Sequence, residues 1–232
     1  MSGYLSPLLI HLVDSAYTGK NQSVYEEVYH RLNSLLESLR KRDPHYEDHV
    51  RKVCFYASEF GRAQRLSEKE IRRLYLGAFF HDIGKAFISA EIINKRGSLD
   101  AEERRVMMTH AELGEIICRE LGPFEEIAEL VGSHHERPNG TGYPRGLRGN
   151  ESSDTARILA IIEIYDALRS ERSYKKAYSL EQSLEILRQS AAGGDLDSNV
   201  TAEFTKFFRR IRGNPRSADH HHYELSRPIC FR

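Results

Sequence analysis

Apolar residues recur at helical spacing along most of the chain. In the stretch SVYEEVYHRLNSLLESLRKR they stand three or four positions apart, at Val24, Val28, Leu32, Leu35 and Leu39. Residues at that spacing share one face of an α-helix. Alternating apolar and polar positions, the pattern typical of half-buried strands, are nearly absent. The hydrophobic pattern therefore predicts an all-α fold.

Breaks in this pattern divide the chain into helices. Asp43 and Pro44 end the first long helix, and a second is expected from about His45 to Phe60. Ser67 followed by Glu70 is a capping-box pattern that opens the next helix. Further helices are expected to open at GSLDAEE and at GPFEE. The longest irregular stretch is RPNGTGYPRGLRGNESSD, and AAGGDLDSN is a second break.

These breaks predict three parts of the chain. Residues 1–42 form an N-terminal helical extension, residues 43–212 form the main domain, and residues 213–232 form a tail with little periodicity. The extension is too short for a separate sensory domain. Its apolar stripe is expected to pack on the main domain, with the pairing of two subunits in a homodimer as the alternative.

Composition excludes several classes of protein. The 34 basic and 34 acidic residues cancel, which argues against binding of a long nucleic acid or an anionic membrane. Cys54, Cys118 and Cys230 are odd in number and scattered, so neither a disulfide framework nor a thiolate metal site is expected. No export signal and no apolar run of roughly 20 residues is visible. We therefore expect a cytoplasmic protein without a membrane span.

Two apolar helices carry acidic residues. Asp82 follows the apolar run LYLGAFFH, and Glu163 and Asp166 are embedded in ARILAIIEIYDAL. A buried carboxylate without a partner is costly, so each should find a cation or several hydrogen-bond donors. A metal ion, an arginine or a backbone cap would each satisfy this requirement.

The histidines favour the metal. Six of the eleven stand at His45, His49, His81, His110, His134 and His135, which is too many for isolated core imidazoles. His45 and His49 are one helical turn apart and share a face, whereas the adjacent His134 and His135 do not. Both of the latter can serve one site only where a helix gives way to a loop. A cluster of oxygen and nitrogen donors without cysteine favours iron, manganese or zinc.

Other histidines are not expected to bind the metal. His11 and His30 are expected to be ordinary surface or core residues. The His220–His222 cluster could chelate a metal, but in an irregular tail a solvated role is the better interpretation.

Three separated motifs resemble one known family. HDIGK, HHERPNGTGYP and ARILAIIEIYDALRSERSYKK, in this order, are similar to the HD-GYP family of bacterial cyclic di-GMP phosphodiesterases over roughly residues 43–190. The resemblance implies an all-helical HD-domain bundle with a GYP-containing loop beside a metal site. It also implies a centre of two or three ions, with iron or manganese expected and zinc or nickel as alternatives. Two such ions can orient a phosphodiester for in-line attack.

The resemblance also implies a role for individual residues. The family's metal ligands match His49, His81, Asp82, His110, His134, His135 and Glu163, and His45 matches a ligand of a third metal in some members. Asp82 is expected to bridge two ions and to be essential for catalysis. Glu163 stands where the family usually has aspartate, which puts metal occupancy at issue.

Substrate contacts follow from the same resemblance. Lys85 matches a residue that contacts the scissile phosphate and neutralises charge during the reaction. Arg172 and Lys175 match contacts to the phosphate or guanine of the substrate, with an ordinary solvated basic face as the alternative.

The loop after His135 is expected to form a wall of the substrate cleft, because its glycines and prolines force the chain to turn beside the metal site. Tyr143 offers a ring face and a hydroxyl to a nucleotide, or pins the loop to the core. Asn139 stands where the family usually has aspartate. Glu136 is expected to orient a histidine from behind.

Three functions are compatible with these residues. The first is metal-dependent hydrolysis of cyclic di-GMP to GMP, linear pGpG or both. The second is a catalytically weak or inactive protein that senses a cyclic dinucleotide, or binds a protein partner of the diguanylate-cyclase type through the GYP loop. Glu163 and Ser173, at a position where the family more often has proline, favour this alternative. The third is an HD phosphohydrolase that acts on another nucleotide, such as a mixed cyclic dinucleotide.

Overall fold

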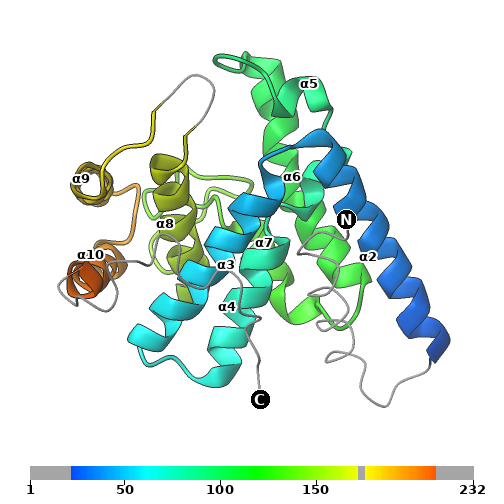
Figure 1. The fold of residues 1–232 in the computed structure, drawn as a ribbon, viewed down its shortest axis with the longest axis horizontal. Coiled ribbons are helices and arrows are strands. Elements are labelled where there is room, and N and C mark those ends of the chain that lie inside the picture. The colour runs from blue at the N-terminus through cyan, green and yellow to red at the C-terminus, as the bar shows by residue number, and fades with distance from the viewer. Residues whose placement is uncertain (1–21, 172–175, 213–232) are drawn as a thin grey trace.

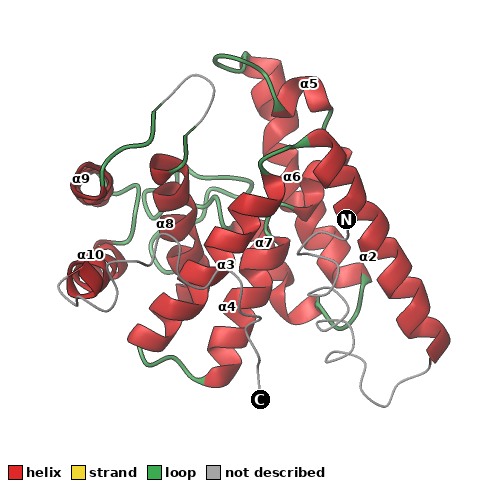
Figure 2. Ribbon diagram, in the orientation of Figure 1, coloured by secondary structure: helices red, strands yellow, loops and turns green. Residues whose placement is uncertain are grey.

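The computed structural model describes residues 22–171 and 176–212, which form a set of packed helices (Figure 1, Figure 2). Within these ranges the only β-pairing is an isolated bridge between Asn139 and Arg148. The all-α prediction is confirmed. The helices are α2 (Gln22–Arg42), α3 (Tyr46–Ala63), α4 (Glu68–Phe80), η1 (Ile83–Phe87), α5 (Ala90–Ile93), α6 (Ala101–Glu120), η2 (Glu125–Ile127), α7 (Ala128–Ser133), α8 (Asp154–Arg169), α9 (Leu180–Ala192) and α10 (Ser198–Arg212).

The helix starts follow the local sequence signals. Ser67 caps α4 in the predicted capping box, in which its hydroxyl accepts from the Glu70 N–H and the Glu70 side chain accepts from the Ser67 N–H. Asp100 forms the same motif with Glu103 at the start of α6. The break at Asp43 and Pro44 separates α2 from α3, as expected.

Helix α2 packs on the rest of the chain through its apolar stripe. Val28, Leu32, Leu36 and Leu39 are buried in the main hydrophobic core. The last residue of the helix, Arg42, donates from its guanidinium to the carbonyl of Ile88, at 2.6 Å. The apolar stripe is therefore used within the chain, and α2 covers the segment that follows η1.

The central helices bring distant parts of the chain together. In Figure 1, α3 and α4 lie side by side, with α6 and α7 behind them and α8 beside α3. Helices α9 and α10 cover the far side of α8. Aromatic residues pack α10 on both α8 and α3: the ring centroids of Tyr165 and Phe208 lie 4.4 Å apart, and those of Phe60 and Phe204 lie 5.1 Å apart.

Glycines allow the closest approach between elements. A Cβ on Gly84 would lie 2.0 Å from the carbonyl oxygen of His110, and a Cβ on Gly114 would lie 2.7 Å from a methyl of Val131. No side chain fits at either place without moving backbone or core. These two glycines let η1, α6 and α7 converge at one point.

Among the residues that the structure describes, no helix combines the length and the apolar character needed to cross a membrane.

Candidate metal centre

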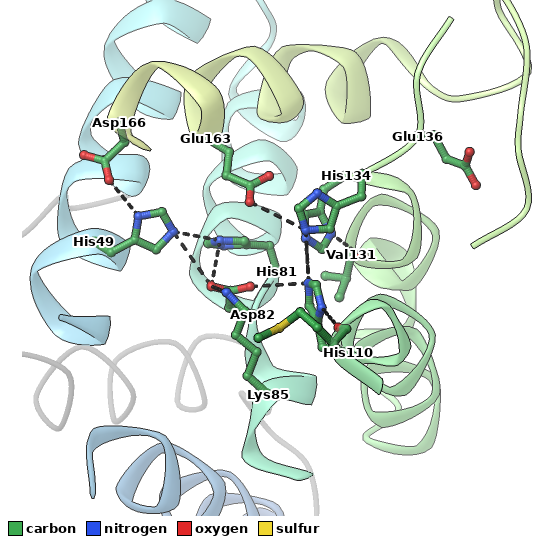
Figure 3. Close-up of polar contacts among 12 residues, drawn as sticks. His49, His81, Asp82, Lys85, His110, Val131, His134, Glu136, Glu163 and Asp166 are labelled. Carbon is green, nitrogen blue, oxygen red and sulfur yellow. Dashed lines mark hydrogen bonds and ion pairs between the residues drawn. The ribbon is translucent and has the colours of Figure 1, made fainter. Parts of the chain in front are cut away.

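The predicted metal ligands converge from five parts of the chain (Figure 3). Among the described residues, two groups have ligand atoms close enough to hold an ion. The His49 cluster consists of His49, His81 and Asp82, and the His110 cluster consists of His110, His134 and His135. Asp82 lies between the two groups, and Glu163 reaches down from α8 beside the second.

The His49 cluster joins α3 to the end of α4. The Nε2 atoms of His49 and His81 lie 3.1 Å apart. Oδ2 of Asp82 lies 3.8 Å from Nε2 of His49 and 3.4 Å from Nε2 of His81. His81 is fully buried, and Asp82 is 1% exposed.

The His110 cluster joins α6 to the end of α7. Nε2 of His110 lies 3.3 Å from Nε2 of His134 and 3.2 Å from Nε2 of His135. Oδ1 of Asp82 lies 3.5 Å from the same His110 nitrogen. The two oxygens of Asp82 therefore face different clusters. His134 closes α7 as its C-cap, which places both adjacent imidazoles at a helix end, as their spacing requires.

Backbone carbonyls fix the tautomer of three of these rings. The Nδ1 atom of each ring lies 2.6–2.8 Å from the carbonyl oxygen three residues earlier, in the pairs His81–Ala78, His110–Met107 and His134–Val131. A carbonyl oxygen only accepts hydrogen bonds, so Nδ1 carries the proton in each ring. The Nε2 atoms that face the centre are then lone-pair donors, as metal ligation requires.

The structure leaves these lone pairs facing one another. Burial lowers the pKa of His110 to about 4, and burial also holds the pKa of His134 and His135 well below the ordinary value. Neutral imidazoles at 3.2–3.3 Å would repel through their Nε2 lone pairs. Within the described part of the chain, Oδ1 of Asp82 and Oε2 of Glu163 are also buried without a hydrogen-bond partner. A divalent cation would satisfy all of these atoms, so the residues present fit a metal centre.

Charge at the centre is concentrated on Asp82. Burial alone would raise its pKa, but the ammonium group of Lys85, followed by the neighbouring His81, holds that pKa well below its usual range. Nζ of Lys85 donates to Oδ2 of Asp82 at 2.7 Å. Burial alone would lower the pKa of Lys85, but the Asp82 carboxylate raises it. Both groups are therefore ionised, and Lys85 lies at the edge of the centre.

Glu163 is a weaker member of the set. Its Oε1 atom lies 3.6 Å from Nε2 of His135. Burial raises the pKa of Glu163, with Asp82 contributing in the same direction. The longer side chain thus reaches the His110 cluster, and the charged form of Glu163 lacks a partner there unless a cation is bound.

The loop after His135 lies directly against the centre. The ring of Tyr143 stacks on His135, with centroids 4.6 Å apart and an interplanar angle of 27°. A Cβ on Gly142 would lie 2.4 Å from the backbone nitrogen of Arg137, so the loop crosses its own start at the closest distance that glycine permits. The ring of Tyr143 thus ties the loop to a predicted ligand.

Glu136 has a different role from the expected one. Its two carboxylate oxygens accept from the backbone N–H groups of Arg145 and Leu147, at 2.7 and 2.9 Å. Figure 3 shows the carboxylate turned away from the imidazoles. Arg145 adds bonds from its guanidinium to Ser133 and Glu115. Glu136 therefore holds the loop in place, and backbone carbonyls orient the histidines instead.

Among the described residues, one predicted ligand is not brought into either cluster. His45 is the N-cap of α3, is exposed, and belongs to neither group, so its role as a third-metal ligand stays a prediction. Arg172, Lys175, Ser173 and the His220–His222 cluster lie outside the described residues.

Asp166 contacts the predicted ligand His49, although the sequence did not assign Asp166 a role in the site. Its Oδ2 atom lies 2.7 Å from Nδ1 of His49, and the residue is 2% exposed. The sequence signal was its burial within the apolar α8 helix. The partner, 117 positions away, could be found only from the fold.

Family and structure comparisons agree with this fold. Residues 33–200 match the HD domain family model. An HDG"Y"P protein from Bdellovibrio bacteriovorus, Bd1817, superposes with a TM-score of 0.61 at 17% identity, covering 88% of this chain and 64% of that one. The HD domain of the Listeria monocytogenes phosphodiesterase PgpH gives a TM-score of 0.57 at 15% identity, covering 77% of this chain and 97% of that one. The HD-domain fold is confirmed.

Curated relatives share the sequence more strongly. The 3'3'-cGAMP-specific phosphodiesterase 3 of Vibrio cholerae is 37% identical, over 64% of this chain and 32% of the relative. The response regulator RpfG of Xanthomonas campestris, a cyclic di-GMP phosphodiesterase, is 32% identical over 71% and 44%. A cyclic di-GMP phosphodiesterase of Thermotoga maritima is 31% identical over 81% and 51%. The chain thus spans about a third to a half of the length of these relatives.

Proposed function

The chain belongs to the HD domain family and carries the HD-GYP motifs, and from this premise we propose that it is a metal-dependent phosphodiesterase that hydrolyses cyclic di-GMP. The products are GMP, linear pGpG or both. The observation that carries the proposal is the placement of Asp82, whose two oxygens face two separate imidazole clusters.

The residues of each cluster would hold one ion. His49 and His81 would ligate the first, the His110 cluster and Glu163 would ligate the second, and Asp82 would bridge them. Iron or manganese suits this set of nitrogen and oxygen donors. When bound, the two ions would supply positive charge to a phosphate oxygen and lower the pKa of an attacking water molecule.

The other residues bind and orient the substrate. Lys85, fixed by Asp82 at the edge of the centre, neutralises charge that develops on the phosphate. Tyr143 offers its ring face to a base, because its other face is stacked on His135. Arg172 and Lys175 are proposed to contact the substrate's phosphate or guanine.

A second substrate has specific support. Three of the curated relatives are named 3'3'-cGAMP-specific phosphodiesterases, at 33–37% identity. Cyclic di-GMP and 3'3'-cGAMP share the same phosphodiester chemistry and differ in one base. The mixed dinucleotide is therefore the alternative substrate, and the metal centre would serve both.

The test is hydrolysis by protein loaded with Mn²⁺ or Fe²⁺ under anaerobic conditions. Cyclic di-GMP and 3'3'-cGAMP are supplied separately, and products are resolved by chromatography beside an Asp82→Ala control. We expect turnover of cyclic di-GMP that the control lacks. Faster turnover of 3'3'-cGAMP would change the assigned substrate.

Failure to hydrolyse either compound, with metal bound, would overturn the enzymatic proposal. Retained nucleotide binding in that case would favour the sensor. A diguanylate-cyclase-type partner at the GYP loop and a homodimer stay predictions, which co-purification and sedimentation would test.

A further inference from the structure

His49 differs from the other oriented imidazoles in what holds it. The Nδ1 atoms of His81, His110 and His134 each contact a neutral backbone carbonyl of their own chain segment. Nδ1 of His49 instead contacts a carboxylate of another helix, Oδ2 of Asp166 on α8, at 2.7 Å. Figure 3 shows Asp166 on the side of the His49 ring away from the centre.

The Asp166 carboxylate has few other hydrogen-bond partners. Asp166 is 2% exposed, and the only other side-chain hydrogen bond to it in the described residues comes from the hydroxyl of Ser170, 3.4 Å from both oxygens. The 2.7 Å contact is in the range of a charge-assisted hydrogen bond, and the Ser170 contact is long and weak. Asp166 therefore interacts chiefly with His49.

A hydrogen bond that only linked α3 to α8 would not explain the position of the second ring nitrogen of His49, Nε2. Nε2 of His49 points at Nε2 of His81, 3.1 Å away, and His81 must carry its own proton on Nδ1. A carboxylate at Nδ1 favours the His49 tautomer with its lone pair at Nε2, as metal ligation requires. The contact with Asp166 at Nδ1 and the lone pair at Nε2 thus require the same tautomer of His49.

We propose that Asp166 is a positioning residue that sets the tautomer and orientation of His49 as a metal ligand. The inference rests on the metal centre of the proposed function, but not on its substrate. Asp82 faces both clusters, whereas Asp166 contacts only the His49 cluster. In the His110 cluster, backbone carbonyls contact the Nδ1 atoms of His110 and His134.

The experiment compares Asp166→Asn with the wild type in Mn²⁺ titrations of the full chain, with free Mn²⁺ followed by electron paramagnetic resonance. The wild type should bind two ions in separate steps. In Asp166→Asn the dissociation constant of one ion should rise by about 10–100-fold, the usual effect of removing such an outer partner, and that of the other ion should stay unchanged.

Asp154→Asn is the matched control. Asp154 lies on the same helix, is exposed, and pairs with Arg157, so its variant should keep both dissociation constants. Unchanged binding of both ions by Asp166→Asn would overturn the proposal. So would a wild type that binds no Mn²⁺, which would remove the proposed function as well.

A second measurement does not depend on the variant folding. ¹⁵N spectra of metal-free wild-type protein, labelled at histidine, report which ring nitrogen of His49 carries the proton. We expect the proton on Nδ1, and a fraction with the proton on Nε2 in Asp166→Asn. A wild-type ring protonated on Nε2 alone would contradict the proposal. Mn²⁺ binding as expected without hydrolysis of any cyclic dinucleotide would leave it standing and overturn only the assigned activity.

Discussion

The two imidazole clusters use the same donor atoms but are built differently. The His49 cluster takes its ligands from α3 and the end of α4, and a carboxylate from α8 holds one of its rings. In the His110 cluster, the rings of His110 and His134 are held by carbonyls of their own helices, and Tyr143 from the loop covers His135. One cluster thus depends on long-range charge, and the other on local backbone geometry and loop packing.

Because of this difference, the two clusters should be sensitive to different substitutions. Changes in charge should affect the His49 cluster first, whereas changes in packing between η1, α6 and the loop should affect the His110 cluster. Asp82 joins them, because its two oxygens face opposite sides. Single substitutions can therefore distinguish the His49 cluster from the His110 cluster.

The largest expected effect comes from removing one ligand of either cluster. His49→Ala and His110→Ala should each bind one ion where the wild type binds two, and turnover should fall by about 10³-fold or more, because a second ion contributes several kcal/mol of charge stabilisation. Metal content by elemental analysis and steady-state rates provide the test. If either variant kept both the second ion and the rate, its cluster would not form part of the centre.

The next effect concerns the contact between η1 and α6. Gly84→Ala would place a Cβ 2.0 Å from the backbone oxygen of His110, so the two clusters must move apart. We expect the free energy of unfolding to fall by roughly 3 kcal/mol, the upper part of the usual cost of overpacking. Thermal and denaturant unfolding measure this.

Gly193→Ala is the control for that substitution. Gly193 has an ordinary φ of −78°, and a Cβ there would meet only atoms at 3.6 Å or beyond. Its variant should unfold like the wild type. Equal stability of the Gly84 and Gly193 variants would mean that the close contact between η1 and α6 is not required.

A smaller effect is expected from Glu163, and it depends on pH. Because burial raises the pKa of Glu163 in the folded protein, the metal-free fold binds this proton more readily than the unfolded chain does. This group's contribution to the free energy of unfolding therefore falls as pH rises from about 4.3 through the raised pKa. Glu163→Gln removes that loss.

Metal-free Glu163→Gln should accordingly be more stable than the wild type near neutral pH, by about 1–3 kcal/mol for a buried charge without a partner. The difference should vanish near pH 4, and with metal bound the order should reverse. Denaturant unfolding across pH measures both. If the difference in the free energy of unfolding were the same at every pH, the Glu163 carboxylate would have a partner in the metal-free protein.

Exchange of Glu163 for Asp compares the departure with the family's usual residue. If the extra methylene gives poor ligation, Glu163→Asp should gain both metal and rate. A loss of both would show that this site is fitted to the longer side chain.

The smallest effect is expected at the loop. Tyr143→Phe keeps the ring stacked on His135 and should change KM by less than about threefold, whereas Tyr143→Ala loses a contact worth about 1 kcal/mol and should raise KM several-fold. Steady-state kinetics with the better cyclic dinucleotide provide the test. Equal KM values for the two variants would remove the ring from the substrate site.

Much of the fold could be predicted from local pattern. The stripe from Val28 to Leu39 and the capping box at Ser67 depend on neighbours within one or two turns, so the chain alone determines them. The short helices η1 and α5 were not predicted. Helix η1 follows tertiary packing around Gly84, and both helices are too short to show a hydrophobic period.

The site was predicted where residue type determines its chemistry. Imidazoles and carboxylates in apolar surroundings require partners, and this pointed to the ligands before any geometry was known. The partners behind the ligands were not visible. Asp166 meets His49 across 117 positions, and Glu136 serves the loop although it follows two predicted ligands directly. Such roles depend on direction in space, which spacing along the chain does not give.

The central claim is that the two clusters form one centre that Asp82 joins. Anomalous diffraction from crystals of the Mn²⁺-loaded protein tests it most directly. We predict two peaks about 3.5–4 Å apart, one beside each cluster, with one oxygen of Asp82 next to each peak. A single peak, or two ions that do not share Asp82, would contradict the account.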